Sequence, residues 1–149
     1  METKEVLFTV MCEEETELAK LRDLKDLKTN LIGSQYRIRG EVESYEEDIS
    51  GYPSMSFSVY VRGDFDTQDF KKAIDYFSNK VHFMSLAAWC VGWEGDPQTP
   101  PDDNEKTLIA SFQWNVHGAK ILERRWDLNR KAVNVHVEDF TSACCVAAI

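Results

Sequence analysis

Carboxylate side chains are the groups in this sequence whose number and spacing most invite a chemical interpretation. Two stretches, 41–48 and 94–105, contain five acids each and no base. The acids are Glu41, Glu43, Glu46, Glu47 and Asp48 in the first stretch and Glu94, Asp96, Asp102, Asp103 and Glu105 in the second. Carboxylates grouped in this way can bind a cation, act as acid and base in catalysis, or attract a basic surface. The rest of the sequence helps to choose among these three roles.

Metal binding and catalysis lack supporting sequence patterns. The second stretch has neither the alternating oxygen ligands nor the central glycine of an EF-hand calcium loop. A glycosidase-type carboxylate pair is defined by its separation across a cleft and by unequal pKa values, which a sequence does not supply. The chain has no phosphate-binding glycine loop, dinucleotide fingerprint, serine-hydrolase elbow or H-E-x-x-H zinc motif. We therefore predict no catalytic residue, no metal site and no cofactor.

One histidine, His136, has neighbours that suggest a site. It alternates with Val135 and Val137 in a predicted strand, so we expect it to point away from the core beside Glu138. A surface histidine next to an acid accounts for this arrangement. The alternative is a mixed site of His136, Glu138 and Asp139, which would need the three groups to converge in space.

The charge of the chain is distributed unevenly. Residues 1–105 hold 22 acids and 11 bases, whereas residues 106–149 hold 4 acids and 6 bases, and the net charge is −9. Direct nucleic-acid binding is disfavoured, because contacts to phosphate need a basic face. The exception is a predicted hairpin that carries Lys120, Arg124, Arg125, Arg130 and Lys131 around Trp126. This hairpin could hold phosphate or stack a base, but surface pairing with the acidic body is the simpler explanation.

Trp93 adjoins the second acidic stretch and has two interpretations. As an aromatic residue rimmed by acids, it could anchor a basic protein partner, since interfaces favour a central aromatic with charge at the rim. As a tryptophan at the end of a strand, it would simply close the core. We include Trp93 with the ten acids among the candidate partner-binding residues and keep the core interpretation as its alternative.

Length and composition predict one folded domain over 1–149, with an apolar tail at 140–149. An apolar fraction of 43% is inconsistent with a disordered chain. No run approaches the roughly 20 apolar residues of a membrane helix, and no secretion signal is present, so we expect a cytoplasmic protein of its own cell or of a host. The four cysteines show no CxxC spacing, and we expect reduced thiols.

The elements that must position these residues follow from hydrophobic periodicity. In the first half we predict a strand at 6–10, a helix from the glutamates at 13–15 through leucines up to 31, and strands from 36 and at 55–61 that form a hairpin. The connection at 46–54 is an acidic loop. A second helix follows, with Asp66 as its N-cap, Asp69 three residues later, and a face of Phe70, Ala73, Ile74 and Phe77.

In the second half of the chain we predict mainly strands. Residues 81–93 are apolar at both parities, which favours a strand covered on both faces, with a buried helix as the alternative. An exposed proline-rich loop at 96–104 and strands at 108–116, 119–126 and 132–138 follow, the last with its valines inward. The prediction is an α+β domain: a mainly antiparallel sheet of about six to seven strands with two helices packed on one face.

The leading functional hypothesis is a non-enzymatic acidic binding protein that engages and inhibits a basic protein. A nuclease or another nucleic-acid-binding protein is the partner we expect, with carboxylates in the place of phosphates. Immunity proteins and phage inhibitors share this size and charge, which is an analogy and not homology. The alternatives are a small enzyme with an unrecognised carboxylate/His site, and a structural subunit that self-associates through the apolar tail at 143–149.

Overall fold

The computed structural model describes residues 2–22, 37–38, 43–45, 52–62, 64–94, 102, 105–126 and 132–142. Over these residues the chain forms eight strands and two helices. The strands are β1 Glu2–Met11, β2 Arg37–Ile38, β3 Glu43–Tyr45, β4 Ser54–Arg62, β5 Ser85–Glu94, β6 Thr107–Asn115, β7 Lys120–Trp126 and β8 Ala132–Asp139. The helices are α1 Glu15–Arg22 and α3 Thr67–Ser78.

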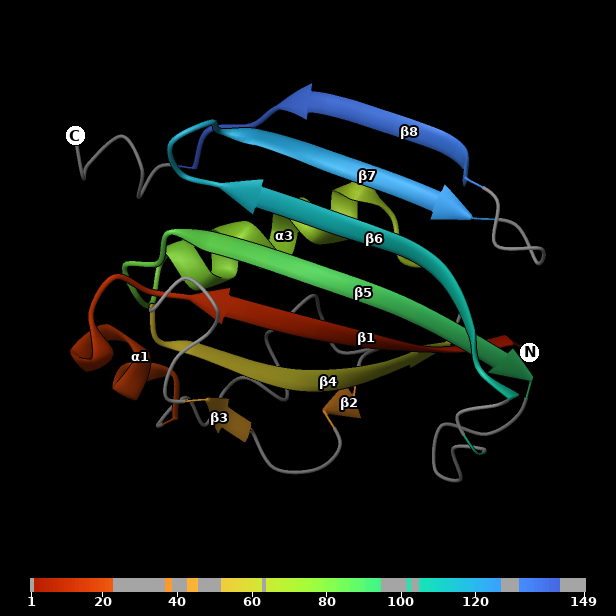
Figure 1. The fold of residues 1–149 in the computed structure, drawn as a ribbon, viewed down its shortest axis with the longest axis horizontal. Coiled ribbons are helices and arrows are strands. Elements are labelled where there is room, and N and C mark those ends of the chain that lie inside the picture. The colour runs from red at the N-terminus through yellow and green to blue at the C-terminus, as the bar shows by residue number, and fades with distance from the viewer. Residues whose placement is uncertain are drawn as a thin grey trace.

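All the strands belong to one antiparallel sheet (Figure 1). Its order is β2-β4-β1-β5-β6-β7-β8, and β3 also pairs with β4. The N-terminal strand β1 is therefore an interior strand, and the three strands predicted after residue 107, β6 to β8, follow one another as antiparallel neighbours. Both β2 and β3 pair with β4, which confirms the predicted hairpin partner of 55–61. The predicted α+β class is confirmed.

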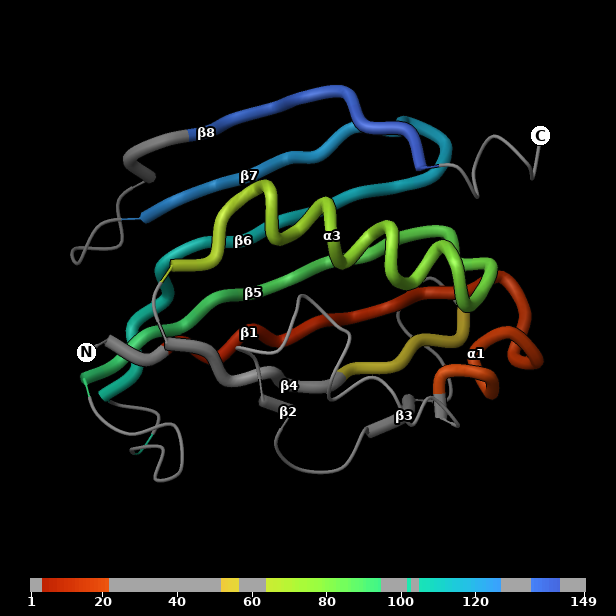
Figure 2. The backbone as a smooth tube through the Cα atoms, turned by 180° about the vertical axis from the view of Figure 1, so that it is seen from behind, coloured from red at the N-terminus to blue at the C-terminus, as the bar shows by residue number. Residues whose placement is uncertain are grey.

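Helix α3 lies across one face of the sheet, over β5 and β6 (Figure 2). It starts where the sequence predicts, because Asp66 and Asp69 form a reciprocal capping box with two hydrogen bonds of 3.0 Å. Its predicted apolar face is buried against the sheet. Asn79 caps the C-terminal end of the helix, where its side chain donates a hydrogen bond to the carbonyl of Asp75 at 2.9 Å. The two ends of α3 are thus fixed by local hydrogen bonds.

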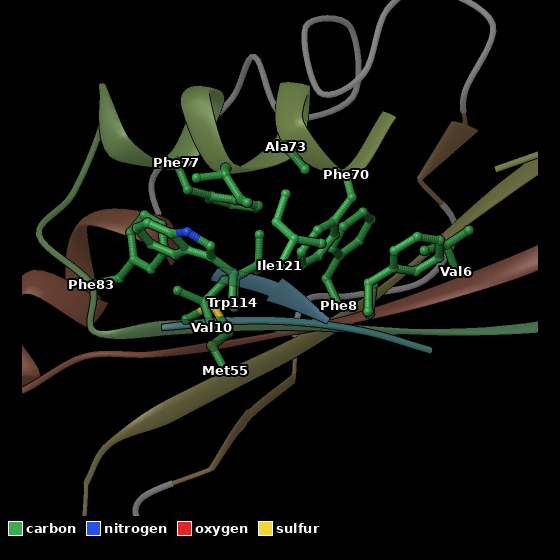
Figure 3. Packing of buried hydrophobic residues seen from close by; sticks show 14 of the residues in the cluster. Val6, Phe8, Val10, Met55, Phe70, Ala73, Phe77, Phe83, Trp114 and Ile121 are labelled. Atoms are coloured by element: carbon green, nitrogen blue, oxygen red, sulfur yellow. The ribbon is translucent and has the colours of Figure 1, made fainter. Parts of the chain in front are cut away.

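The core fills the space between α3 and the sheet (Figure 3). Phe112 of β6 stands between two rings, with centroids 5.2 Å from Phe65 and 5.2 Å from Phe70. Helix α1 contributes Leu18 and Leu21 to the same buried cluster. The packing of two helices on one face is consistent with this arrangement. The predicted continuation of the first helix to 31 lies outside the described residues.

Strand β5 corrects one expectation about burial. It is a strand and not a helix, but over most of its length only one face is fully buried: Leu86, Ala88 and Cys90 face α3, whereas Trp89 on the other face is 41% exposed. The outward residues are apolar without being fully covered, and for that reason periodicity indicated two buried faces. A β-bulge between Cys90 and Val91 shifts the pairing with β6.

Strand β8 corrects a second expectation. Val135 and Val137 were predicted to point inward, but they are 56% and 54% exposed. Register explains the reversal: His136 pairs with Glu123 and Glu138 pairs with Ile121, whose side chain lies in the core on the α3 side. Partners in a pair share a face, so the histidine and the glutamate lie on the α3 side and the valines lie on the outer face.

Candidate functional site

The described part of the second acidic stretch lies at the end of the β5–β6 hairpin (Figure 1). Glu94 is the last residue of β5, and Glu105 donates its backbone N–H to the carbonyl of Asp102 at 2.9 Å just before β6 begins. All three side chains are exposed, and none forms an ion pair with a described residue. Asp96 and Asp103 lie outside the described residues. Three carboxylates therefore face solvent at one end of the sheet.

Trp93 and Lys106 form the base of this loop. Trp93 is 5% exposed, and the Nζ of Lys106 lies 5.5 Å from the centroid of its ring. The same Nζ lies 3.8 Å from the Oε2 of Glu5, an acid of the sheet. Trp93 is not part of the hydrophobic cluster between α3 and the sheet, but its burial leaves little of the ring for a partner to contact. Its role is to hold the hairpin end on the sheet.

The first acidic stretch lies elsewhere. Glu43 is in β3, where its backbone pairs with Ser56, and Ser56 pairs with Thr9. Glu94 pairs instead with Glu2. Residues 2 and 9 are seven positions apart on β1, roughly 23 Å at about 3.3 Å per residue. The sheet therefore places Glu43 and Glu94 toward opposite ends, and the two stretches do not start from one surface. Glu41, Glu46, Glu47 and Asp48 lie outside the described residues.

A polar pocket opens at the N-terminus of α3, a feature that the sequence did not indicate. Its volume is about 360 Å³, and its lining residues are Asp66, Thr67, Gln68, Glu123, Arg125 and His136. Glu123 is only 8% exposed. The pocket lies where the start of α3 passes over β7 and β8.

The buried carboxylate of Glu123 is bound by two other residues of the pocket. The Oε1 of Glu123 accepts from the Nε of Arg125 at 3.0 Å, and its Oε2 accepts from the hydroxyl of Thr67 at 3.2 Å. The Nη2 of Arg125 also donates to the carbonyl of Phe65 at 3.1 Å, and its Nη1 lies 3.7 Å from Asp64. These groups hold the loop before α3 against β7. An i,i+2 Glu-x-Arg pair on one strand was the only signal of this network in the sequence.

His136 and Glu138 are brought together as expected, but on the α3 side. The Nε2 of His136 lies 3.1 Å from Glu138, and the Nζ of Lys71 lies 2.6 Å from the other oxygen of the same carboxylate. Hydrogen bonds from Lys71 and then His136 lower the pKa of Glu138 below its ordinary value. Asp139 faces the opposite side, 3.7 Å from Lys120, so the mixed site of three residues does not form. Within the described residues, no three potential metal ligands are grouped.

The predicted basic hairpin does not present one basic face. Lys120 and Arg124 lie on the outer side of β7, whereas Arg125 is turned toward α3 and bound to Glu123. Arg130 and Lys131 lie outside the described residues. The ion pairs of Lys120 and Arg125 support the simpler explanation, in which these bases balance acids of the same protein.

Comparisons with protein-family models, curated proteins and solved structures give no match to this chain. Neither helix of the described part has the length and apolar character needed to cross a membrane.

Proposed function

We propose that this chain is a non-enzymatic acidic binding protein that engages and inhibits a basic protein partner. The proposal rests on the net charge of −9 and on the hairpin-end carboxylates, which we define as Glu94, Asp102 and Glu105. A cytoplasmic location, in its own cell or a host, is part of the proposal.

One contrast among the acids carries the proposal. Several acids of the sheet and helices are paired with lysines of the fold: Glu5 with Lys106, Glu17 with Lys20, and Glu138 with Lys71. The hairpin-end carboxylates are exposed and form no ion pair with a described residue. Carboxylates that are not paired with a base of the described fold are available to a partner.

The mechanism follows from the electrostatics of exposed carboxylates. Charges on a hairpin end project into solvent and attract a basic surface over about one Debye length, roughly 8 Å at physiological salt. Such steering acts mainly on the association rate. A partner that binds nucleic acid already has a basic face for phosphates, and the carboxylates would occupy that face. The partner class is therefore a nuclease or another nucleic-acid-binding protein.

The experiment is affinity capture with a variant that removes only these charges. Tagged wild-type protein and E94Q/D102N/E105Q are incubated with lysate of the native cell or its host at low salt, and bound proteins are released by rising salt and identified by mass spectrometry. We expect the wild type to retain a basic protein in a stoichiometric amount. The association rate of that purified protein should fall about tenfold for the variant and should fall with salt for the wild type.

A matched control is available at the other end of β1. Glu13, Glu14 and Glu15 are also exposed, and E13Q/E14Q/E15Q changes the net charge by the same amount. This control should keep most of the association rate. Equal losses for the two triple variants would mean that net charge acts without a defined surface, and an unaffected association rate in both would contradict the proposal.

A further inference from the structure

Strand β8 is the outermost strand at one edge of the sheet (Figure 1). It has eight residues, whereas β2 and β3, which pair with β4 at the opposite edge, have two and three. In the hydrogen-bonded order of the described strands, β8 has a neighbour on one side only, β7. Backbone groups at alternate positions of β8 are therefore directed away from the sheet, and a long edge of this kind is a template for another strand.

The outer face of this edge is apolar. Val135 is 56% exposed and Val137 is 54% exposed, although β-branched residues are usually placed on covered strand surfaces. Natural edge strands commonly prevent pairing with lysine or proline, and residues 132–139 contain neither. In the β7–β8 pairing Arg125 is opposite residue 134 and Trp126 is opposite residue 132, so residue 133 of β8 is bulged and has no partner on β7. Residues 134–139 pair regularly.

The sequence of β8 is self-complementary in an antiparallel register. Valines occupy 133, 135 and 137, and the run is symmetric about Val135. Pairing two copies with Val135 opposite itself places Val137 opposite residue 133, also a valine, and His136 opposite residue 134, an asparagine. Like charges do not meet in this register. A shift of the centre to His136 would instead place the two imidazoles opposite each other, which is unfavourable when they are protonated.

We propose that a second copy of this chain pairs with β8, edge to edge and antiparallel, with Val135 on the two-fold axis. The two sheets then become one continuous sheet, and the exposed valines of both copies form a cross-strand row on its outer face. Such an interface uses the same surface on both subunits and closes as a dimer. It does not involve the apolar tail at 143–149.

Charge does not oppose a second copy at this edge. Residues 106–149, which contain β6 to β8, carry 6 bases and 4 acids. Glu94 is on β5, three strands from the edge. In the dimer, seven strand spacings of about 4.8 Å would separate the two β5 strands, roughly 34 Å. This distance is about four Debye lengths at physiological salt, so the hairpin-end carboxylates of the two copies do not oppose pairing.

The test measures mass in solution as a function of concentration. Light scattering after size exclusion is carried out on the full chain and on V135K. Because Val135 is opposite itself, this variant places two lysines together at the axis, while in the single chain its side chain remains exposed. We expect the wild type to approach twice the 17.2 kDa of one chain, and V135K to need at least about tenfold more protein to dimerise.

Two controls separate pairing from folding. Q113K adds the same charge at an exposed position of β6, on the same outer face but two strands inside the edge, and it should dimerise like the wild type. An equimolar mixture of V135K and V135E should recover the dimer as a heterodimer, since opposite charges then meet at the axis.

Three results would overturn the proposal. A wild type that stays at the mass of one chain up to about 100 µM excludes self-pairing, because a dimer with a Kd at or below that concentration would be visible. The edge is then left to an extended segment of another protein. A dimer that persists unchanged in V135K would use another surface. A mixture of V135K and V135E that fails to pair would exclude Val135 from the axis.

Discussion

Arg125 meets a single carboxylate oxygen of Glu123 with two of its nitrogens, Nε at 3.0 Å and Nη2 at 2.9 Å. The other oxygen of Glu123 accepts from Thr67, the first residue of α3. This pair links α3 to β7 by polar contacts. It lies at the border of the core, where water screens its charges only in part.

Removing the arginine should therefore destabilise the fold. In R125M the carboxylate of Glu123 stays largely buried without its counter-charge, and we expect a loss of about 2 kcal/mol in unfolding free energy, below the 3–5 kcal/mol of a fully buried pair because Arg125 is 27% exposed. Urea denaturation measures this loss. The double variant E123Q/R125M should be more stable than R125M, because it removes the unpaired charge; an equal loss in both would contradict the argument.

A matched surface pair gives the scale for that measurement. Lys120 and Asp139 lie 3.7 Å apart with side chains 62% and 87% exposed. Since solvent screens such a pair, K120M should cost less than about 0.5 kcal/mol.

Glu17 should make stability depend on pH in the acid range. It accepts a hydrogen bond from Lys20 at 2.6 Å and from the backbone N–H of His82 at 2.9 Å, and these bonds, Lys20 first, lower its pKa below the ordinary 4.5. A lowered folded pKa gives stability that is present above pH 4.5 and is lost as pH falls through the folded value. The difference in unfolding free energy between wild type and E17Q should therefore be full at neutral pH and shrink below pH 4.5.

Urea denaturation at neutral pH and at about pH 3 would measure this difference. E15Q, which changes an exposed acid of the same helix, serves as the comparison. A wild-type advantage over E17Q that is constant or larger in acid would contradict the assignment.

The buried thiols should be unreactive in the folded protein. Burial, with a smaller contribution from Glu17, raises the pKa of Cys12 to about 12, and burial raises that of Cys90 to about 12. At pH 8 only about one thiol in ten thousand would then be ionised, and the thiolate is the reactive species. Iodoacetamide treatment followed by peptide mass mapping should label both residues in urea and neither in the native state. Rapid native labelling of Cys90 would contradict this prediction.

The β6–β7 turn has its glycine one position too early. Ala119 has φ 51°, in the left-handed region that favours glycine, while the preceding Gly118 has no such φ and a Cβ there would meet nothing within 4 Å. A119G should stabilise the protein by about 1 kcal/mol by relieving the alanine, and G118A by about 0.5 kcal/mol by restricting the unfolded chain. Thermal unfolding of the two single variants and the double variant G118A/A119G measures both effects. A destabilised A119G would contradict the first.

Local patterns predicted much of the fold. The capping box of Asp66 and Asp69, the buried face that begins at Phe70, and the alternation in β1, β4 and β6 could be read directly, because hydrogen bonds and side-chain faces three or four residues apart, or two apart, are set within one element. The antiparallel order of β6 to β8 was also predicted, since short turns join these neighbouring strands. The acidic character of the chain needed only its composition.

Assignment of faces and neighbours depended on the tertiary structure. Alternation in β8 gives two faces but not the one that α3 covers, so the valines were placed inward and His136 outward. The Glu123–Arg125 pair and the pocket beside it could not be predicted either, because their partners Phe65 and Thr67 come from about sixty residues away in the sequence.

The candidate binding surface was also predictable only in part. The sequence by itself determined that carboxylates are grouped at 94–105 and that an exposed loop presents them, because charge and turn residues are local properties. Only the tertiary structure decided that Trp93 is buried beneath Lys106 and that Glu43 starts from the opposite end of the sheet. The physical reason is that burial and distance are set by strand pairing across the whole chain, and one residue of register moves a side chain from one face to the other.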